Sequence, residues 1–403
     1  MKKTEKLNVF IDLADKVQVG QLIHSNNQIY FKYNTDFLEL NINISPLKLD
    51  FNNEIQTCNV NYFEGLFGVF SDSLPDGWGK LLQDRHLIKQ GINPSEVYAL
   101  DRLTLLHKNN AGSLSYMPTT DFQENKFIFN LDKLATEIET ITKGNSENII
   151  DELLTYGGSS GGARPKVYIG YNKNTDEIIY GSEILPEGFE HWILKFPNSN
   201  DLLDIAKIEF TYNQMAKNAG IEVNEFKLFK NSKNQYFFGA KRFDREENKK
   251  THLHSVAGLL HDNFRFSVLD YGHIMDCTYQ LEKDFSAYEK ILRLATFNVL
   301  AHNRDDHSKN FSFLMDDSGK WKFSPAYDLT FSNSSNGMHS TSIANEYQNP
   351  GYKNLQELAT HFSVNNYDAI FNEVRESISN FDKLANEIEL NKNTKKLILT
   401  KIS

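Results

Sequence analysis

Polar residues that could carry phosphoryl-transfer chemistry gather between residues 303 and 328. Asp305 and Asn310 lie five apart in the run NRDDHSKNFSF, and Asp328 follows a predicted hairpin. At this spacing an Asp can hold a substrate hydroxyl while an Asn binds Mg²⁺, and a second carboxylate could return to the same metal. Asp306 is only four residues before Asn310, so we assign the base to Asp305. An Asp–Asn pair alone is more often a helix-capping polar loop, whereas the ordered set is much rarer by chance.

A glycine-rich run could bind the phosphates of a substrate. Glycines and serines fill six consecutive positions, and basic residues follow: Gly157, Gly158, Ser159, Ser160, Gly161, Gly162, Ala163, Arg164 and Lys166. Such a backbone can direct several amides at an anion, although the Gly–Lys–Ser/Thr ending of a Walker A loop is missing. The alternative is a flexible surface loop. The strand-forming VYIGY that follows favours a loop held between strands.

Further upstream, one lysine in an apolar strand could bind the phosphates of a nucleotide. Lys195 lies in WILKFP, and Glu209 lies in the amphipathic helix expected after it. A strand Lys paired with a helix Glu can position nucleotide phosphates, whereas a strand-edge Lys that reaches solvent is the plainer alternative. Lys241 and Phe243, in GAKRFDR, end a strand where we expect the chain to turn helical, a junction that could contact an adenine.

The elements that must position these residues follow from hydrophobic periodicity. The first 115 residues alternate apolar and polar residues like half-buried strands, with Asn26-Asn27 as a hairpin turn and a helix over 78–90. Residues 130–240 mix helices (131–141, 205–219) with strands (166–171, 177–180, 191–197, 235–243). From about 250 the pattern is mostly helical, except for a hairpin over 310–323.

Composition excludes several classes of protein. The chain has 403 residues, 40% hydrophobic and 24% charged, which is typical of a globular protein. Its net charge of −10 disfavours direct, sequence-independent nucleic-acid binding. No apolar run is long enough for a membrane helix, and the start MKKTEKLNVFIDLAD lacks the apolar core of a signal peptide. Two cysteines, Cys58 and Cys277, fit a reduced compartment, so we expect a cytoplasmic protein.

Taken in order, the motifs resemble those of the HipA family of toxin kinases. The motifs are GGSSGGARPK, ILKFP, KRFDR, RDDHSKNFS and YDL, and SDSLPDGWGKLLQDR with AGSLSY match the family's N-terminal region. The resemblance implies an α+β, bilobal protein-kinase-like fold with an added β-rich N-terminal subdomain and a mainly helical C-terminal lobe. We expect the subdomain over 1–116, the kinase N-lobe over 117–240 and the C-lobe over 241–403.

The resemblance also implies roles for individual residues. Asp305 would be the catalytic base of a serine/threonine kinase, Asn310 and Asp328 would bind Mg²⁺, and His307 would face the phosphates or support the loop. The glycine-rich loop, Lys195 and Glu209 would bind ATP, with hinge contacts near Lys241 and Phe243. A loop serine, Ser159 or its neighbour Ser160, would be autophosphorylated and silence the enzyme. The loop ending Ala-Arg-Pro-Lys and Lys241 at the hinge depart from other members, which bears on adenine contacts and substrate identity.

The same resemblance implies partners. Members usually pair with a HipB-like helix-turn-helix antitoxin that binds operator DNA, so this chain would contact DNA only indirectly. The best-known substrates are aminoacyl-tRNA synthetases, whose phosphorylation would inhibit translation and promote persistence.

Two other functions are compatible with the sequence. His302, His307, Asp305 and Asp306, with histidines 252, 254 and 261, could bind a metal for phosphoester hydrolysis. The chain could instead act as a non-catalytic corepressor partner of a DNA-binding antitoxin. Lone histidines are more often structural than ligands, so the kinase hypothesis is favoured.

Overall fold

The structure is a computed structural model of the chain. It describes residues 3–106, 108–120, 130–143, 151, 153–154, 162–334 and 336–402. The predicted phosphate-loop residues Gly157, Gly158, Ser159, Ser160 and Gly161, including both candidate autophosphorylation serines, lie outside the described residues. The end of that loop, from Gly162 onward, is described.

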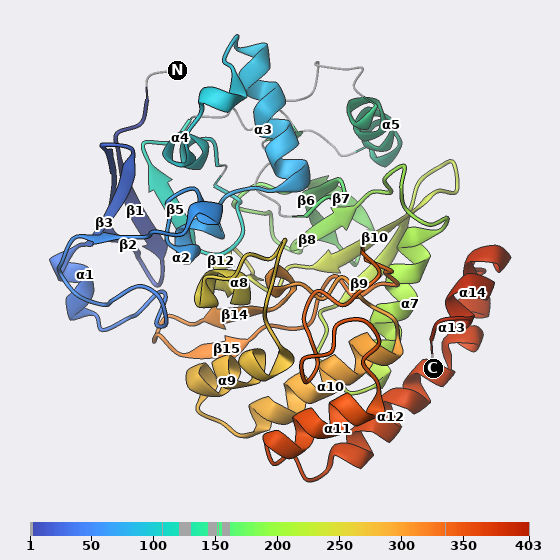
Figure 1. The fold of residues 1–403 in the computed structure, drawn as a ribbon. Helices are drawn as coiled ribbons and strands as arrows, with labels where there is room; N and C mark the ends of the chain where they lie inside the picture. The colour runs from blue at the N-terminus through green and yellow to red at the C-terminus, as the bar shows by residue number, and fades with distance from the viewer. Residues whose placement is uncertain are drawn as a thin grey trace.

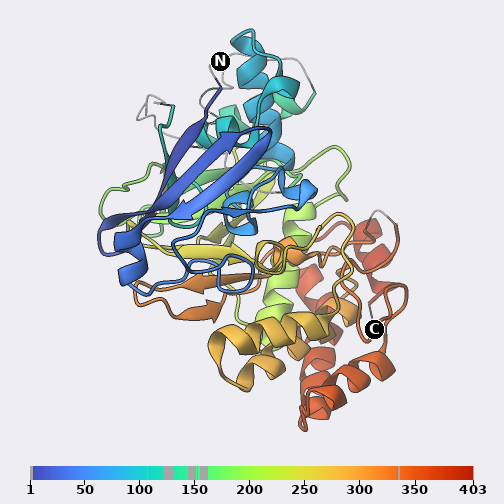
Figure 2. The same cartoon turned by 60° about the vertical axis from the view of Figure 1, so that its left-hand side comes forward.

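The front of the chain forms an antiparallel sheet in the strand order β4-β3-β2-β1-β5 (Figure 1). Its strands are β1 (Lys6–Asp12), β2 (Lys16–Ser25), β3 (Gln28–Tyr33), β4 (Gln56–Thr57) and β5 (Leu114–Met117). Leu7, Val9 and Ile11 alternate into a buried core, as the period of two predicts. Asn26 and Asn27 join β2 to β3 with φ of 51° and 59°, so the predicted hairpin turn is confirmed. Figure 2 brings this sheet forward.

Helices lie between β3 and β5 in the chain, and one of them packs in the next layer. They are α1 (Thr35–Glu39), η1 (Asn61–Phe63), α2 (Gly68–Ser71), α3 (Gly77–Lys89), η2 (Pro94–Glu96) and α4 (Ala99–Thr104). Trp78 and Leu82 of α3 pack with Leu134 and Ile138 of α5 (Leu131–Thr142) in the core of the second sheet. The front segment therefore reaches over to the layer that carries the candidate phosphate-binding residues.

The second sheet places two predicted site lysines side by side. Its antiparallel order is β7-β6-β8-β10-β9, with β6 (Lys166–Asn172), β7 (Glu177–Tyr180), β8 (Glu190–Lys195), β9 (Phe226–Lys230) and β10 (Tyr236–Lys241). In the register of β6 and β8, Lys166 lies opposite Lys195. Trp192, Tyr171 and Phe229 fill the core on the side of α3 and α5.

Helices make up most of the lower part of the molecule in Figure 1. They are α7 (Ile205–Asn218), α9 (Tyr271–Glu282), α10 (Ser286–Leu300), α11 (Tyr352–His361), α12 (Tyr367–Ser379), α13 (Phe381–Glu387) and α14 (Lys392–Leu399). Tyr212 of α7, Phe297 of α10 and Phe381 of α13 meet in one buried core. Helix α7 runs from the second sheet into this helical part and so links the two.

A small sheet in the order β13-β14-β15 lies between the front sheet and the helices. The elements here are β11 (Arg245–Glu246), β12 (Lys249–Lys250), β13 (His252–Ser255), α8 (Val256–Leu260), η3 (Ser308–Asn310), β14 (Ser312–Met315) and β15 (Trp321–Phe323). The expectation that the chain turns helical after Phe243 is wrong, because a hairpin and β13 intervene. No local pattern could reveal β13, since its partner β14 lies about 60 residues later.

The predicted α+β architecture, with a β-rich front and a mainly helical C-terminal part, is confirmed by these layers. The boundaries predicted at residues 116 and 240 stay a prediction. None of the helices in the described part of the chain combines the length and apolar character that a membrane crossing requires.

Candidate functional site

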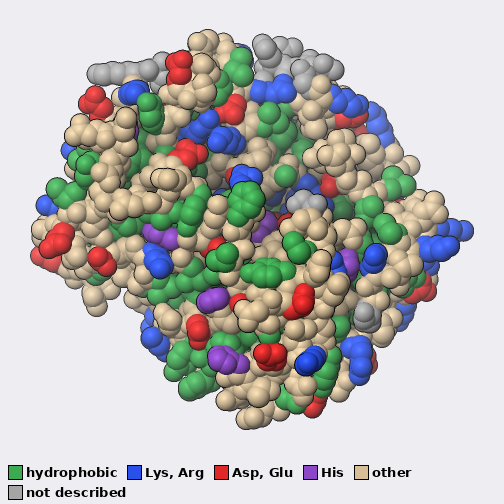
Figure 3. All heavy atoms as spheres, viewed as in Figure 1, with side chains coloured by type: hydrophobic (Ala, Val, Ile, Leu, Met, Phe, Trp, Pro, Cys, Tyr) green, Lys and Arg blue, Asp and Glu red, His purple; other side chains and the backbone are tan. Residues whose placement is uncertain are grey.

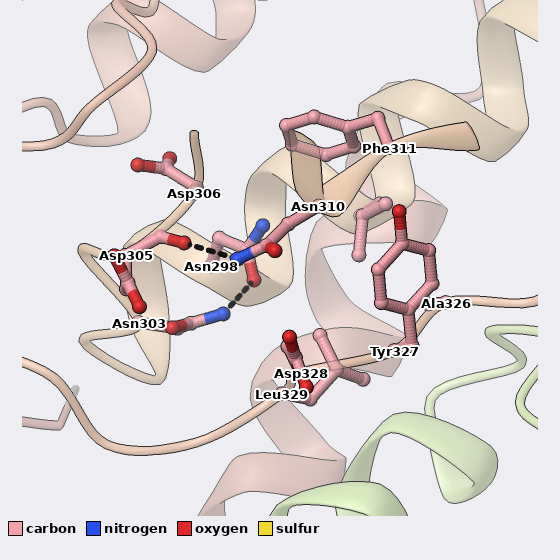
Figure 4. A pocket seen from close by; sticks show the side chains of 11 residues that line it. Asn298, Asn303, Asp305, Asp306, Asn310, Phe311, Ala326, Tyr327, Asp328 and Leu329 are labelled. Atoms are coloured by element: carbon pink, nitrogen blue, oxygen red, sulfur yellow. Dashed lines mark hydrogen bonds between the residues drawn. The ribbon is translucent and has the colours of Figure 1, made fainter. Parts of the chain in front are cut away.

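Three of the four predicted catalytic residues line one pocket, which is formed by α10, the loop 303–311 and the segment after β15, whereas His307 does not line it. Asp305, Asn310 and Asp328 lie around this pocket (Figure 4). The side-chain amide nitrogen of Asn310 donates to the backbone carbonyl oxygen of Asp305 at 2.7 Å, which closes the loop. This leaves the side-chain oxygen of Asn310 for the pocket. The spacing of five residues therefore has a structural cause.

Asp305 has the exposure and electrostatic setting of a base. Its side chain is 53% exposed. Desolvation at the pocket, opposed by His307 and assisted by the charge of Asp328, raises the pKa of Asp305 above its usual value. A carboxylate with a raised pKa is a better proton acceptor, which suits a general base.

Asp306, next in the chain, points the other way and is buried. Its carboxylate accepts from the Tyr271 hydroxyl at 3.0 Å and from the Ser340 amide at 2.8 Å, and it contacts His339 Nδ1 at 2.8 Å. The Tyr271 hydroxyl in turn accepts from Asn298. This arrangement anchors the catalytic loop to the segment beyond Asp328. The sequence offered no sign of it beyond the four-residue spacing.

Lys195 joins the second sheet to both α7 and the catalytic pocket. Its ammonium group forms ion pairs with Glu209 of α7 and with Asp328, and Glu209 is almost fully buried. Burial acts to lower the pKa of Lys195, but Asp328 and Glu209 outweigh it and raise the pKa. Burial acts to raise the pKa of Asp328, but Lys195 and Lys166 hold it well below its usual range. The plainer alternative, a Lys reaching solvent, does not describe this buried side chain.

The described end of the glycine-rich run adds cations beside this pair. Lys166 is buried, and burial lowers its pKa against the opposing attraction of Asp328. Gly162 has a φ of +87°, and a Cβ there would lie 2.8 Å from the Lys166 Nζ. Arg164, beyond Ala163, donates to Asp201 at 2.9 Å and lies 3.6 Å from Glu209. Sequence reasoning did not identify Asp201.

The predicted hinge residues do not line this pocket. Lys241 donates to Glu190 at 2.6 Å, and the Phe243 ring lies 5.4 Å from that of Tyr327, the neighbour of Asp328. Between them, Arg242 binds Asp244 and the backbone of Asn110.

Arg242 and Arg245 are therefore used structurally. Both are buried against Asp244, and both donate to backbone carbonyls of residues 109–112, just before β5. Burial acts to raise the pKa of Asp244, but Arg242 and Arg245 hold it well below its usual range. These two arginines bind the front segment rather than a phosphate.

The histidines of the hydrolase alternative are dispersed. His307 lies 3.9 Å from Asp305, but His302 contacts Asn333 at 2.9 Å. His252, His254 and His261 instead contact residues of the front segment. Within the described residues, no group of three or more His, Cys, Asp or Glu side chains could hold a metal.

The donor set fits Mg²⁺ bound with a phosphate ligand. Asp328 would supply a carboxylate that two lysines hold ionised. Asn310 would supply its side-chain oxygen, because its side-chain nitrogen is bonded to Asp305. Mg²⁺ in nucleotide sites is commonly held by one or two protein oxygens, with phosphates and waters completing its shell. Asp328 also has a left-handed φ of 54°, which turns the chain at this point.

Comparisons with known proteins agree along the chain. The HipA-like C-terminal domain matches residues 158–381, more than half of the chain, and the HipA N-terminal domain matches residues 8–117. No curated protein matches.

Solved structures similar to it include the following two. One is HipA in the Shewanella oneidensis MR-1 complex of HipA, HipB and operator DNA, with a TM-score of 0.71 and 17% identity over 98% of this chain and 94% of that one. At this identity the likeness shows the fold. The other is the Helicobacter pylori proinflammatory kinase CtkA, with a TM-score of 0.35 and 14% identity over 53% and 88%. That score is too low to carry an argument.

Proposed function

The chain belongs to the HipA family, and from that premise we propose that it is an ATP- and Mg²⁺-dependent serine/threonine protein kinase, the toxin of a toxin–antitoxin pair. The observation that carries the proposal is the buried Lys195, which pairs with Glu209 and with Asp328 at the pocket of Asp305 and Asn310. A strand lysine, a helix glutamate, a base and two metal-binding oxygens are the parts that phosphoryl transfer needs.

Each residue then has one task. Lys195 and Lys166 bind the phosphates, and Asp328 and Asn310 would hold Mg²⁺, which when bound offsets the negative charge of the phosphates. Asp305 orients the substrate hydroxyl and takes its proton as the new oxygen–phosphorus bond forms and the bond to ADP breaks. Positioning and electrostatics supply most of the rate, because the protein forms no covalent bond itself.

The direct test is transfer of labelled phosphate from ATP. The purified chain is incubated with γ-labelled ATP, Mg²⁺ and host lysate, and labelled proteins and sites are identified by mass spectrometry. Asp305→Asn should lower transfer at least about 100-fold, the usual loss for a missing base. Asp36→Asn, the same change at an exposed position of helix α1, is the matched control. Full transfer by Asp305→Asn would reject Asp305 as the base. Label appearing only as free phosphate would favour hydrolysis.

The protein substrate follows from the family resemblance rather than from the described residues. We propose a serine or threonine of a translation protein, with aminoacyl-tRNA synthetases as the first class to test. Autophosphorylation is proposed for Ser159 or Ser160, which lie outside the described residues. Mass spectrometry of the kinase itself in the same reaction distinguishes the two serines.

A second, compatible role is binding to an antitoxin. The similar Shewanella protein is in a complex with HipB and operator DNA, and the match covers 98% of this chain. We propose a basic helix-turn-helix partner, because this chain has a net charge of −10. Acidic and basic side chains are interspersed on the face seen in Figure 3. The complex of this chain with its antitoxin should retard operator DNA in a gel-mobility assay. The complex formed by the Asp305→Asn variant should retard it equally.

A further inference from the structure

The proposed function leaves Asp76, in the motif SLPDGWG, without a task. Asp76 is the N-cap residue of α3, where an Asp side chain normally accepts a hydrogen bond from its own helix. No such bond is present. Its carboxylate instead binds two segments that are distant in sequence, so helix capping does not explain the residue.

One of those segments is the described end of the glycine-rich run. A carboxylate oxygen of Asp76 accepts from the Gly162 amide, and Trp78 donates through its amide to the Gly162 carbonyl at 3.0 Å. The Trp78 indole also donates to the Lys166 carbonyl at 3.1 Å. The front segment therefore holds both ends of residues 162–166.

Gly77 makes this approach possible. Its φ is +42°, and a Cβ at this position would lie 2.4 Å from the Gly162 carbonyl oxygen. A side chain would thus force the two backbones apart.

The other segment is the catalytic loop. The second carboxylate oxygen of Asp76 accepts from Lys309 at 2.9 Å, and both side chains are mostly buried. Lys309 directly precedes Asn310, and its carbonyl oxygen accepts from the Tyr327 hydroxyl at 2.6 Å. Tyr327 directly precedes Asp328. One carboxylate thus contacts the glycine-rich segment and the residue next to a predicted Mg²⁺ ligand.

We propose that Asp76 is a positioning residue for phosphoryl transfer, which fixes residues 162–166 relative to the catalytic loop. This inference rests on the proposed function. It makes the front subdomain part of the apparatus that aligns donor phosphate and acceptor hydroxyl. Misplacement by about 1 Å can cost about 100-fold in rate, so a contact that sets this distance has a large effect without touching substrate.

The test compares variants of the full chain in the labelled-ATP assay. Asp76→Ala removes both contacts, and Asp76→Asn keeps an acceptor for Gly162 but loses the charge opposite Lys309. Trp78→Phe removes the indole bond and some of the core packing around it. We expect kcat to fall at least about tenfold for Asp76→Ala and less for the other two, with a smaller change in KM for ATP. Asp101→Asn, which alters a buried carboxylate of α4 that accepts from the amides of Thr4 and Tyr98, should keep the wild-type kcat.

A double-mutant cycle separates positioning from general damage. If Asp76 acts through Lys309, Asp76→Ala with Lys309→Ala should lose much less than the product of the two single losses. Asp76→Asn, the variant least disturbing to the fold, must melt near the wild-type temperature. An active wild type whose Asp76→Asn and Asp76→Ala forms keep kcat within about twofold refutes the inference alone. A wild type without transfer refutes the proposed function and the inference with it.

Discussion

Neighbouring carboxylates in the catalytic loop should respond oppositely to the same substitution. Asp305→Asn changes a side chain that is 53% exposed, whereas Asp306→Asn changes one that is fully buried. We expect the first variant to lose transfer and keep stability. We expect the second to lose stability, and to lose activity only as the loop anchored by Asp306 shifts.

The size of the stability effect follows from the contacts of Asp306. One oxygen accepts from Tyr271 and meets His339, and the other accepts from Ser340. An Asn keeps only one acceptor oxygen and turns an NH₂ group toward donors on the other side. Each buried group left without a partner costs about 1–3 kcal/mol, so a loss of about 3 kcal/mol is a reasonable central figure. Exposed changes usually stay within about 0.5 kcal/mol.

Thermal unfolding followed by circular dichroism measures the difference. At about 2–4 °C per kcal/mol for a lobe of this size, Asp306→Asn should melt roughly 6–12 °C below wild type. Asp305→Asn should melt within about 2 °C of wild type and be inactive in the labelled-ATP assay. If the two variants melt together, the assignment of one carboxylate to chemistry and the other to anchoring is wrong.

Two more predictions concern how the front segment is attached. Burial lowers the pKa of His252 and of His261 to about 4. As the pH falls, these histidines take up protons in the unfolded chain before they do so in the folded one. Their contribution to stability should therefore be constant above about pH 7 and fall between about pH 6.5 and 4. His252→Gln should flatten a plot of melting temperature against pH. Asp244→Asn leaves two buried arginines without their carboxylate and should cost about 3–5 kcal/mol, whereas Lys241→Ala, which breaks a partly exposed pair with Glu190, should cost less than about 1 kcal/mol. A melting temperature that Asp244→Asn leaves unchanged would contradict the structural role given to Arg242 and Arg245.

Local sequence predicted the elements well but not the contacts between distant segments. Periodicity located β6, β8 and α7, and with them the pairing of Lys195 and Glu209 across 14 residues. The partners of Asp76 lie 86 and 233 residues away in the sequence, so no local pattern indicates them. The anchoring role of Asp306 and the strand β13 are not predictable for the same reason. Their partners are distant in sequence and are set by tertiary packing, which produces no periodic pattern in the sequence.

Lys195 couples the binding of the nucleotide to the binding of its metal. Its ammonium group already pairs with Asp328 as well as Glu209. The proposed function needs Asp328 for the cation and Lys195 for the phosphates, so the pair between them must be exchanged. Asp328 engaged with a cation would leave Lys195 free to pair with a phosphate, and Lys195 engaged with a phosphate would leave Asp328 free for a cation. Each ligand therefore favours the other through the same ion pair, and thermodynamic linkage makes the effect reciprocal. The nucleotide and its metal should thus bind together, while the pair with Glu209 keeps Lys195 in place throughout.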